Sequence, residues 1–292
     1  LDVGGTTHID AGGAVNLDRT DGMGRPVNRF GGAVSLRGRG SYISAAGTLA
    51  FSDFDVDSLF ATAAVVQLPA SGRSIGLQYF QGDVALTRDS VLDSQLGQIS
   101  FRGRIDGGYA LTLTSGLNVV FAGDVGGNQA LASLDSRGAG PLQLGGNITA
   151  DGAIRLGNVN LVANTPRVFS IRSNNGNLLA GRIDGSSDGR SSLALNAHGA
   201  LELQSGAGTT PGAGLANLEL KGSSVIAQAL RTSGRLDVSS GTGFTQGGTL
   251  TVGGDASFSA GSGGDLMLDT TANTFAGKVA LSGNQVRIRA QP

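Results

Sequence analysis

The chain has 292 residues, including 50 glycines and no cysteine, and its 21 basic and 22 acidic residues give a formal net charge of −1. This balance lacks the basic excess needed to neutralise phosphates, so we expect no nucleic-acid partner, and the missing cysteines exclude disulfides and thiolate chemistry. Hydrophobic residues make up 39% and aromatic residues 5% of the chain. This composition predicts a folded protein with a thin, mainly aliphatic core.

The start of the chain and its apolar runs bear on export and membrane insertion. The first residue is Leu1, and no charged-then-apolar signal segment precedes the pattern, which predicts a processed chain or a piece of a longer one. The longest apolar candidate, Ala61 to Leu68, is far shorter than the ~18 residues of a membrane-spanning helix. We therefore expect no membrane-spanning segment.

Two segments near the start depart from the pattern that dominates the rest. Residues 17–30 are rich in Asp and Arg and contain Pro26, and they predict a loop that leaves the main body. Residues 52–80 contain Pro69 and an acidic run, and they predict a second irregular loop or insertion. Insertions in repeat proteins often carry the binding surface.

The acidic run Asp53, Asp55 and Asp57 alternates with Phe54 and Val56. On a strand the three carboxylates would face one side at ~6.6 Å intervals, a separation found in inverting glycosidases and suited to a bridging divalent cation. The simpler interpretation is a solvated acidic edge with the two apolar residues facing inward. The three aspartates are candidates for surface binding.

Tyr79 is a further candidate for surface binding, as a ring on which a sugar would stack. Tyr42 and Phe80 are similar candidates in or near the irregular first third. The alternative for all three rings is burial beneath a loop.

From about Val84 onward the sequence repeats itself. Residues 99–107 align with residues 119–127 at an offset of 20, and residues 121–125 align with 144–148 at an offset of 23. The segment Gly-Arg-Ile-Asp-Gly at 103–107 recurs at 181–185. Short apolar–polar–apolar triplets between turn residues indicate brief strands with one buried face, arranged in a repeat of about 20 residues.

These repeats predict an all-β fold, a right-handed parallel β-helix (β-solenoid) that occupies residues 1–292 as a single segment. About 13 to 14 coils, each one full turn, would stack at the ~4.8 Å spacing of paired strands and form aliphatic ladders inside. Glycine and asparagine are expected at corners that need positive φ, such as Asp151-Gly152 and Asn175-Gly176. The rival architecture is an up-and-down barrel or a sandwich with longer strands.

No motif for catalysis or metal binding stands out. Residues 185–189 match the G-x-S-x-G nucleophile elbow, but a strand-like segment follows where the elbow needs a helix, so we interpret them as a Gly/Ser-rich corner. His8 and His198 lack the spacing of zinc ligands and are expected in surface turns. We expect no enzyme, no catalytic residue, no cofactor and no metal site.

The stretches ISFRGRIDGGYALTLTSGLNVVFAGDVGGNQ and GFTQGGTLTVGGDASFSAGSGGDLMLDTT carry a family resemblance. They resemble the repeat regions of filamentous-haemagglutinin-like large exoproteins of two-partner secretion. The resemblance covers residues 98–290 well and the first hundred residues poorly, and the secretion domain of that family is not found. It implies a parallel β-helix exported through an outer-membrane β-barrel transporter to the bacterial cell surface or medium.

Three functions remain open on these grounds. The first is an extracellular structural or adhesive stalk, mediating attachment, aggregation or biofilm matrix through cell-surface or matrix glycans. The second is a self-assembling extracellular fibre subunit, in which the chain associates with copies of itself. The third is a β-helical enzyme acting on polysaccharide.

Overall fold

The computed structural model describes residues 1–186 and 188–289, and every regular element within them is a strand. Strands pair in parallel with the strand one coil earlier or later, for example at Ile99↔Val119 and Phe121↔Leu144. The prediction of an all-β parallel solenoid is confirmed, with about 12 turns of about 21 residues instead of 13 to 14 shorter coils. The offsets of 20 and 23 residues found in the sequence are the separations at which these strands pair. In the described residues, no helix is long and apolar enough to cross a membrane.

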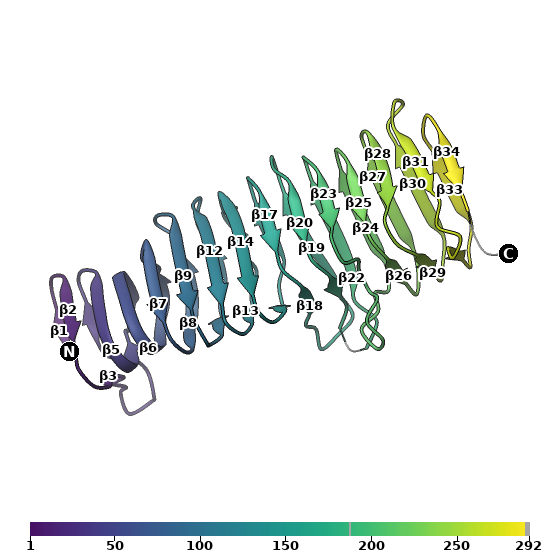
Figure 1. The fold of residues 1–292 in the computed structure, drawn as a ribbon. Coiled ribbons are helices and arrows are strands. Elements are labelled where there is room, and N and C mark those ends of the chain that lie inside the picture. Colours follow the sequence, from purple (N-terminus) through teal and green to yellow (C-terminus); the bar gives the residue numbers. More distant parts are fainter. Residues whose placement is uncertain (187, 290–292) are drawn as a thin grey trace. The chain divides into compact units, whose positions relative to one another are not determined.

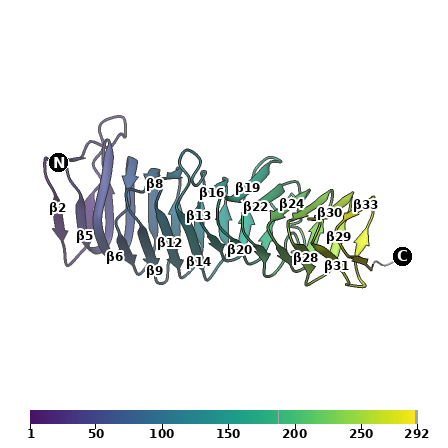
Figure 2. The same cartoon turned by 90° about the horizontal axis from the view of Figure 1, so that it is seen from above.

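The chain divides into two compact units, residues 1–146 and 147–292; the prediction of one continuous segment stays a prediction. Successive coils of the first unit lie side by side in sequence order (Figure 1 and Figure 2). Its strands are β1 (Asp2–Val3), β2 (Thr7–Asp10), β3 (Val15–Leu17), β4 (Arg29–Phe30), β5 (Val34–Ser44), β6 (Thr48–Gln67), β7 (Ser71–Ser74), β8 (Gln78–Ala85), β9 (Ser90–Ser94), β10 (Ile99–Phe101), β11 (Ile105–Asp106), β12 (Ala110–Ser115), β13 (Val119–Phe121), β14 (Ser133–Gly138) and β15 (Leu142–Leu144).

Stacked phenylalanines form part of the core of the first unit. Phe80, Phe101 and Phe121 are at most 1% exposed and come from paired positions on β8, β10 and β13. Ring centroids lie 5.1 Å apart between Phe80 and Phe101 and 5.8 Å apart between Phe101 and Phe121. The expected ladders were aliphatic, whereas this column is aromatic. Parallel in-register strands place like residues above one another, and rings stack well at that spacing.

A column of glycines follows the phenylalanine column at the next corner. A Cβ on Gly123 would lie 2.7 Å from the carbonyl oxygen of Gly103, and a Cβ on Gly103 would overlap the carbonyl oxygen of Gly82. Neither Gly103 nor Gly123 has a positive φ. Glycine is needed at these two positions because the neighbouring coil's backbone occupies the space that a side chain would fill.

The two segments expected to be irregular differ from each other. Residues 18–28 leave the stack between β3 and β4 as a loop. Residues 52–80, by contrast, lie largely in β6, β7 and β8, so the expected irregular insertion there is not what the structure shows. The aspartates of the acidic run suggested an irregular segment, but buried residues recur along the whole strand, from Phe54 through Leu59 to Val66.

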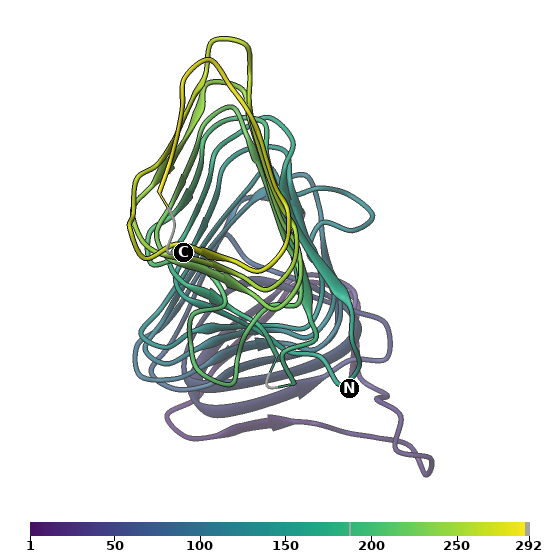
Figure 3. The ribbon, with the colours of Figure 1, turned by 90° about the vertical axis from the view of Figure 1, so that its right-hand side faces the viewer.

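The second unit has the same construction, with three short strands in most coils. Its C-terminal coils, yellow in Figure 3, trace a three-sided outline. Its strands are β16 (Ile148–Ala150), β17 (Ile154–Leu156), β18 (Val159–Leu161), β19 (Val168–Ser173), β20 (Leu178–Ala180), β21 (Ile183–Asp184), β22 (Ser192–Ala197), β23 (Leu201–Leu203), β24 (Leu218–Gly222), β25 (Val225–Ala227), β26 (Leu230–Thr232), β27 (Leu236–Ser240), β28 (Gly243–Gln246), β29 (Leu250–Val252), β30 (Ala256–Ala260), β31 (Asp265–Leu268), β32 (Thr274–Phe275), β33 (Val279–Ser282) and β34 (Val286–Ile288).

Asparagine and aspartate stabilise the corners through their side chains. Within the described ranges no residue other than glycine has a positive φ, so the expectation that asparagine supplies such corners is wrong. Their side-chain oxygens instead accept backbone N–H groups about one coil further on, which satisfies donors that turns would leave unpaired. The pairs are Asp83 with Arg104, Asp89 with Ala110, Asn158 with Arg182, Asn177 with Ala200, Asn217 with Arg235 and Asp255 with Lys278.

Candidate functional site

The acidic run lies on the outer face of β6. Phe54 and Val56 are 2% and 3% exposed, so both point inward as expected, while Asp55 and Asp57 are exposed and Asp53 is half-buried. The three aspartates thus alternate with core residues. Their outward position is what the sequence predicted.

Asp55 lies in a column of alternating charge that crosses the outer face of the first unit. It pairs in register with Arg37 on β5 and with Arg73 on β7. Arg37 also pairs with Asp10 on β2, and Arg73 pairs with Asp93 on β9. Opposite charges on neighbouring parallel strands attract one another modestly, by about 0.2–1 kcal/mol per pair.

Asp53 is also held by the neighbouring coil. An Arg37 guanidinium nitrogen lies 3.2 Å from Asp53 Oδ1, and the Ser35 hydroxyl donates to the same oxygen at 3.0 Å. Asp53 therefore shares Arg37 with the charge column. Two of the three aspartates face arginines of adjacent strands, so the run is an ordered part of the surface and not a bare acidic edge.

Tyr79 belongs to a second outward column, made of aromatic rings. Tyr42, Phe60 and Tyr79 occupy paired positions on β5, β6 and β8. The rings of Tyr42 and Phe60 are stacked, with centroids 4.5 Å apart and planes 6° from parallel, and Phe60 and Tyr79 are 5.9 Å apart. Tyr42 is 44% exposed and the other two are half-buried. We call these three residues the aromatic column.

The sequence interpretation of the rings was incomplete. Phe80 was a candidate surface ring with burial beneath a loop as the alternative, and it is fully buried, in the phenylalanine stack of the core. Neighbouring residues of a strand face opposite sides, so Tyr79 and Phe80 cannot share a surface. Phe60 was missed, although its offsets of 18 from Tyr42 and 19 from Tyr79 fit the length of one coil.

The loop of residues 18–28 is closed by its own hydrogen bonds. Asp21 Oδ1 accepts hydrogen bonds from the backbone N–H groups of Met23 and Arg25, and Asp21 Oδ2 accepts one from the Nε–H of Arg25 at 2.9 Å. The backbone N–H of Arg25 is the main cause that lowers the pKa of Asp21, followed by that of Met23. Gly24 has φ +76° at the tip, which explains the glycine there. The loop is therefore an ordered hairpin-like turn.

A buried asparagine ties the end of this loop to the coils. Asn28 is 2% exposed, its side-chain N–H donates to the carbonyl oxygen of Leu17, and its own carbonyl oxygen accepts the N–H of Ala46. The end of the loop is therefore tied to the neighbouring coil.

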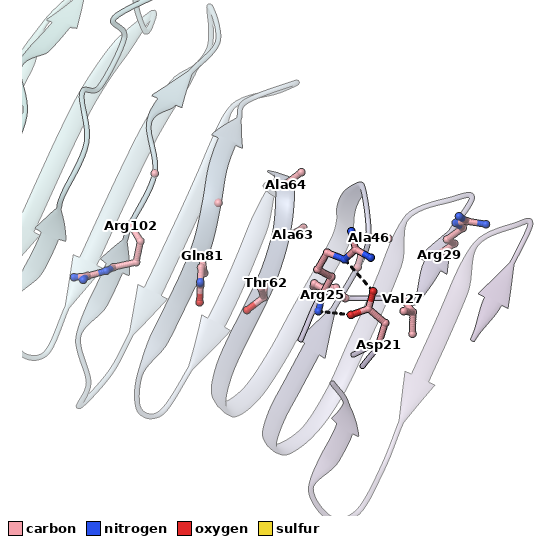
Figure 4. A pocket seen from close by; sticks show the side chains of 14 residues that line it. Asp21, Arg25, Val27, Arg29, Ala46, Thr62, Ala63, Ala64, Gln81 and Arg102 are labelled. Atoms are coloured by element: carbon pink, nitrogen blue, oxygen red, sulfur yellow. Dashed lines mark hydrogen bonds and ion pairs between the residues drawn. The ribbon is translucent and has the colours of Figure 1, made fainter. Parts of the chain in front are cut away.

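Between the loop and the coils lies an open groove of about 830 Å³ (Figure 4). We call it the loop groove. Alanines and glycines form part of its lining, and the small size of these residues leaves room for a concave surface. Its lining comprises Asp21, Arg25, Pro26, Val27, Arg29, Ala45, Ala46, Thr62, Ala63, Ala64, Gln81, Gly82, Arg102 and Gly103.

The loop groove borders the aromatic column. Thr62 follows Phe60 by two residues on β6, and Gln81 follows Tyr79 by two residues on β8, so each pair shares the outer face of its strand. Thr62 and Gln81 are paired in register. The first unit thus presents stacked rings next to a groove that contains three arginines and one aspartate. The sequence did not predict that the rings and the groove are neighbours, because their proximity depends on the register between coils.

The G-x-S-x-G match forms a turn. The Ser186 hydroxyl donates to Asp188 Oδ1 at 2.5 Å, which is the main cause of the lowered pKa of Asp188, and lies 2.6 Å from the hydroxyl oxygen of Ser191. Gly189 has φ +64°, and strand β22 follows at Ser192. Ser187, the residue in the nucleophile position, lies outside the described residues.

The two histidines occupy different local settings. His8 lies on strand β2 with its side chain exposed, which differs from the expected turn, whereas His198 directly follows strand β22 and is exposed. Within the described part of the chain, no three His, Cys, Asp or Glu side chains are grouped closely enough to hold a metal ion.

Comparisons with known proteins give one match. A family model described as Repeats of unknown function (DUF5649) matches residues 1–37 and 170–282, which together are 150 residues and about half of the chain. No curated protein and no solved structure matches the chain.

Proposed function

We propose that this chain, which belongs to the family of repeats of unknown function (DUF5649), is an extracellular structural and adhesive segment of a secreted bacterial surface protein. In this role the stacked coils form a durable scaffold, and outward columns of side chains make the contacts with cell-surface or matrix glycans. The segment would thereby promote attachment, aggregation or matrix formation.

The observation that carries this proposal is that inward and outward positions of the coils differ in role: inward side chains form the core, and outward side chains form exposed columns. Inward positions of the coils are filled by packed apolar side chains such as Leu113, Phe121 and Leu203, each at most 1% exposed. Outward positions pair from coil to coil, so exposed side chains form columns along a face, as in the aromatic column and the column of alternating charge. A surface of this type supports binding by many small contacts to a long ligand.

The finer proposal is that the chain is a repeat region of a filamentous-haemagglutinin-like exoprotein. The Gly-rich repeats within residues 98–290 support it, since their glycines and short strands are of the kind found in that family. Export through an outer-membrane β-barrel transporter would follow, and copies of the chain could associate side by side. A transporter gene next to the gene for this chain would support this origin.

A display experiment tests the adhesive role. The chain is anchored on the surface of a bacterium that does not adhere, and attachment to glycan-coated plates and cell aggregation are measured. The matched control carries Phe101→Ala, which removes a fully buried ring and disturbs the coils without altering surface charge. We expect attachment with the intact chain and less with the control at equal surface level. No attachment by the intact chain would contradict the proposal.

A further inference from the structure

We infer that the loop groove and the aromatic column together bind an anionic polysaccharide, whose sugar rings stack on the aromatic column while its acidic groups face the groove arginines. This inference rests on the proposed adhesive function and names the ligand class of its surface. Three observations of the first unit carry it.

The aromatic column offers a platform for sugar rings. The three rings of this column project from β5, β6 and β8, which pair with one another in successive coils. The rings of Tyr42 and Phe60 are nearly parallel, and the column continues to Tyr79 along the stacking direction. Tyr42 and Phe60 each cover one face of the other, and the electron-rich ring faces that remain uncovered attract the C–H groups of a saccharide. Tyr42 and Tyr79 each add a hydroxyl for hydrogen bonding. Exposed tyrosine is suited to such contacts because it has an apolar body and a polar tip.

The charge of the loop groove selects an acidic ligand. The groove is lined by three arginines and one aspartate, so positive groups exceed negative ones by two. These residues are Arg25, Arg29, Arg102 and Asp21. Arg25 is engaged by Asp21. Within residues 1–186 and 188–289, Arg29 and Arg102 form no ion pair, and both are exposed. Guanidinium groups bind carboxylate and sulfate through paired, charge-assisted hydrogen bonds.

The direction of the groove favours a polymer. Its lining runs from Ala46 past Ala64 and Gly82 to Gly103, which belong to successive coils, and Figure 4 shows Thr62, Gln81 and Arg102 in the same order. The aromatic column runs parallel to the groove, because its rings lie two residues before the groove residues on the same strands, as Phe60 does before Thr62 and Tyr79 before Gln81. A linear chain that follows the stacking direction meets rings and arginines at once, whereas a small ligand would meet only a part of them.

The binding test uses the full chain and four polymers: polygalacturonate, chondroitin sulfate, neutral dextran and poly-glutamate. Polygalacturonate carries carboxylates alone and chondroitin sulfate carries both carboxylates and sulfates, so comparing the two shows what sulfate adds. Dextran lacks charge, and poly-glutamate lacks sugar rings. Dissociation constants are measured by biolayer interferometry at two salt concentrations. We expect binding to at least one anionic polysaccharide, weaker binding to poly-glutamate and no measurable binding to dextran, with weakening at high salt.

Paired variants locate the site. Arg29→Gln with Arg102→Gln should weaken binding at least about tenfold, and Tyr42→Ala with Tyr79→Ala should weaken it about two- to tenfold. Tyr79→Phe keeps the ring and should retain most of the affinity. The matched controls are Arg155→Gln on β17 and Tyr109→Ala, which alter exposed residues that do not line the groove. They should leave the affinity unchanged, and circular dichroism checks that every variant is folded.

Other outcomes overturn the inference. These are binding to none of the polysaccharides, equal binding to dextran, equal binding to poly-glutamate, and equal weakening by the controls and the groove variants. The display experiment separates this failure from that of the proposed function. A displayed chain that still promotes attachment when the groove variants are introduced retains the adhesive role and loses the groove as its site.

Discussion

The carboxylate of Asp83 connects two coils of the first unit by holding Arg104 at both its backbone and its side chain. Asp83 Oδ1 accepts the backbone N–H of Arg104 at 2.9 Å, and Asp83 Oδ2 accepts a guanidinium N–H of the same residue at 2.8 Å. The side-chain hydrogen bond is the first cause of the lowered pKa of Asp83, and the backbone N–H is the second. Contacts of this kind help to fix the register between coils, in addition to the hydrogen bonds between paired strands.

The lowered pKa of Asp83 predicts how its contribution depends on pH. The folded-state pKa lies below the unfolded value of about 3.9, so the stabilisation is complete above that value and disappears as pH falls through the folded-state pKa. Asp83→Asn should therefore lower the melting temperature at pH 7, and the difference from the parent chain should shrink below about pH 4. Asp57→Asn is the control, since Asp57 is exposed and its side chain has no hydrogen-bond partner among the described residues. Equal effects of the two variants at every pH would contradict this assignment.

The glycine column predicts a sharp difference between two Gly→Ala substitutions. Gly123→Ala places a methyl group 2.7 Å from the carbonyl oxygen of Gly103, a backbone atom that cannot move away alone. We expect a loss of about 1–3 kcal/mol in the free energy of unfolding, measured by urea denaturation. Gly40→Ala meets nothing within 4 Å and should change it by less than about 1 kcal/mol. If the two variants unfold at the same urea concentration, the close approach of the coils at Gly103 and Gly123 is refuted.

The phenylalanine stack predicts a large effect from one buried ring. Phe101→Ala removes the ring between Phe80 and Phe121 and should destabilise the protein by about 3–5 kcal/mol. Phe101→Leu fills most of the same volume and should cost less than about 1.5 kcal/mol. Urea denaturation of both variants measures the difference. A small effect of Phe101→Ala would mean that the ring is not packed in a core.

The charge column predicts a salt-dependent effect at Asp55. Asp55→Arg places a third positive charge between Arg37 and Arg73 and should destabilise the protein by about 1 kcal/mol at low salt. Screening should reduce the effect at 1 M salt, because the Debye length falls to about 3 Å. Asp55→Asn removes the attraction without adding repulsion and should have a smaller effect. A loss for Asp55→Arg that is independent of salt would argue against an electrostatic cause.

The sequence predicted the stacking where similar segments recur about one coil apart. Ile99 pairs with Val119 and Phe121 with Leu144, as the alignment required. The repeated Gly-Arg-Ile-Asp segments also have matching local roles: Ile105 and Ile183 are fully buried, and Asp106 and Asp184 each accept N–H groups from a later coil. Identical short segments fold alike because stacking places the same demands on every coil.

The candidate site was harder to predict, because it depends on which residues meet across coils. Asp53, Asp55 and Asp57 were read correctly as an outward set, but their arginine neighbours lie on other strands and were not assigned to them. Tyr79 was identified as a candidate, but its neighbour Phe60 was not. The groove beside Tyr79 is formed by a loop whose path depends on hydrogen bonds of Asp21 and Asn28, which the sequence alone does not reveal. A register of 18 to 20 residues, applied to Arg37, Asp55, Arg73 and Asp93, would have revealed the charge column.

Both the charge column and the loop groove depend on one claim, that coils stack in parallel in the stated register. The chain has no cysteine, so an engineered pair reports on that register without interference. Val91 and Thr112 are outward partners on β9 and β12, and we predict that Val91→Cys with Thr112→Cys forms an intramolecular disulfide on mild oxidation. Val91→Cys with Thr114→Cys, two residues out of register, should remain reduced under the same conditions. Ready oxidation of the second pair with no oxidation of the first would contradict the stacking.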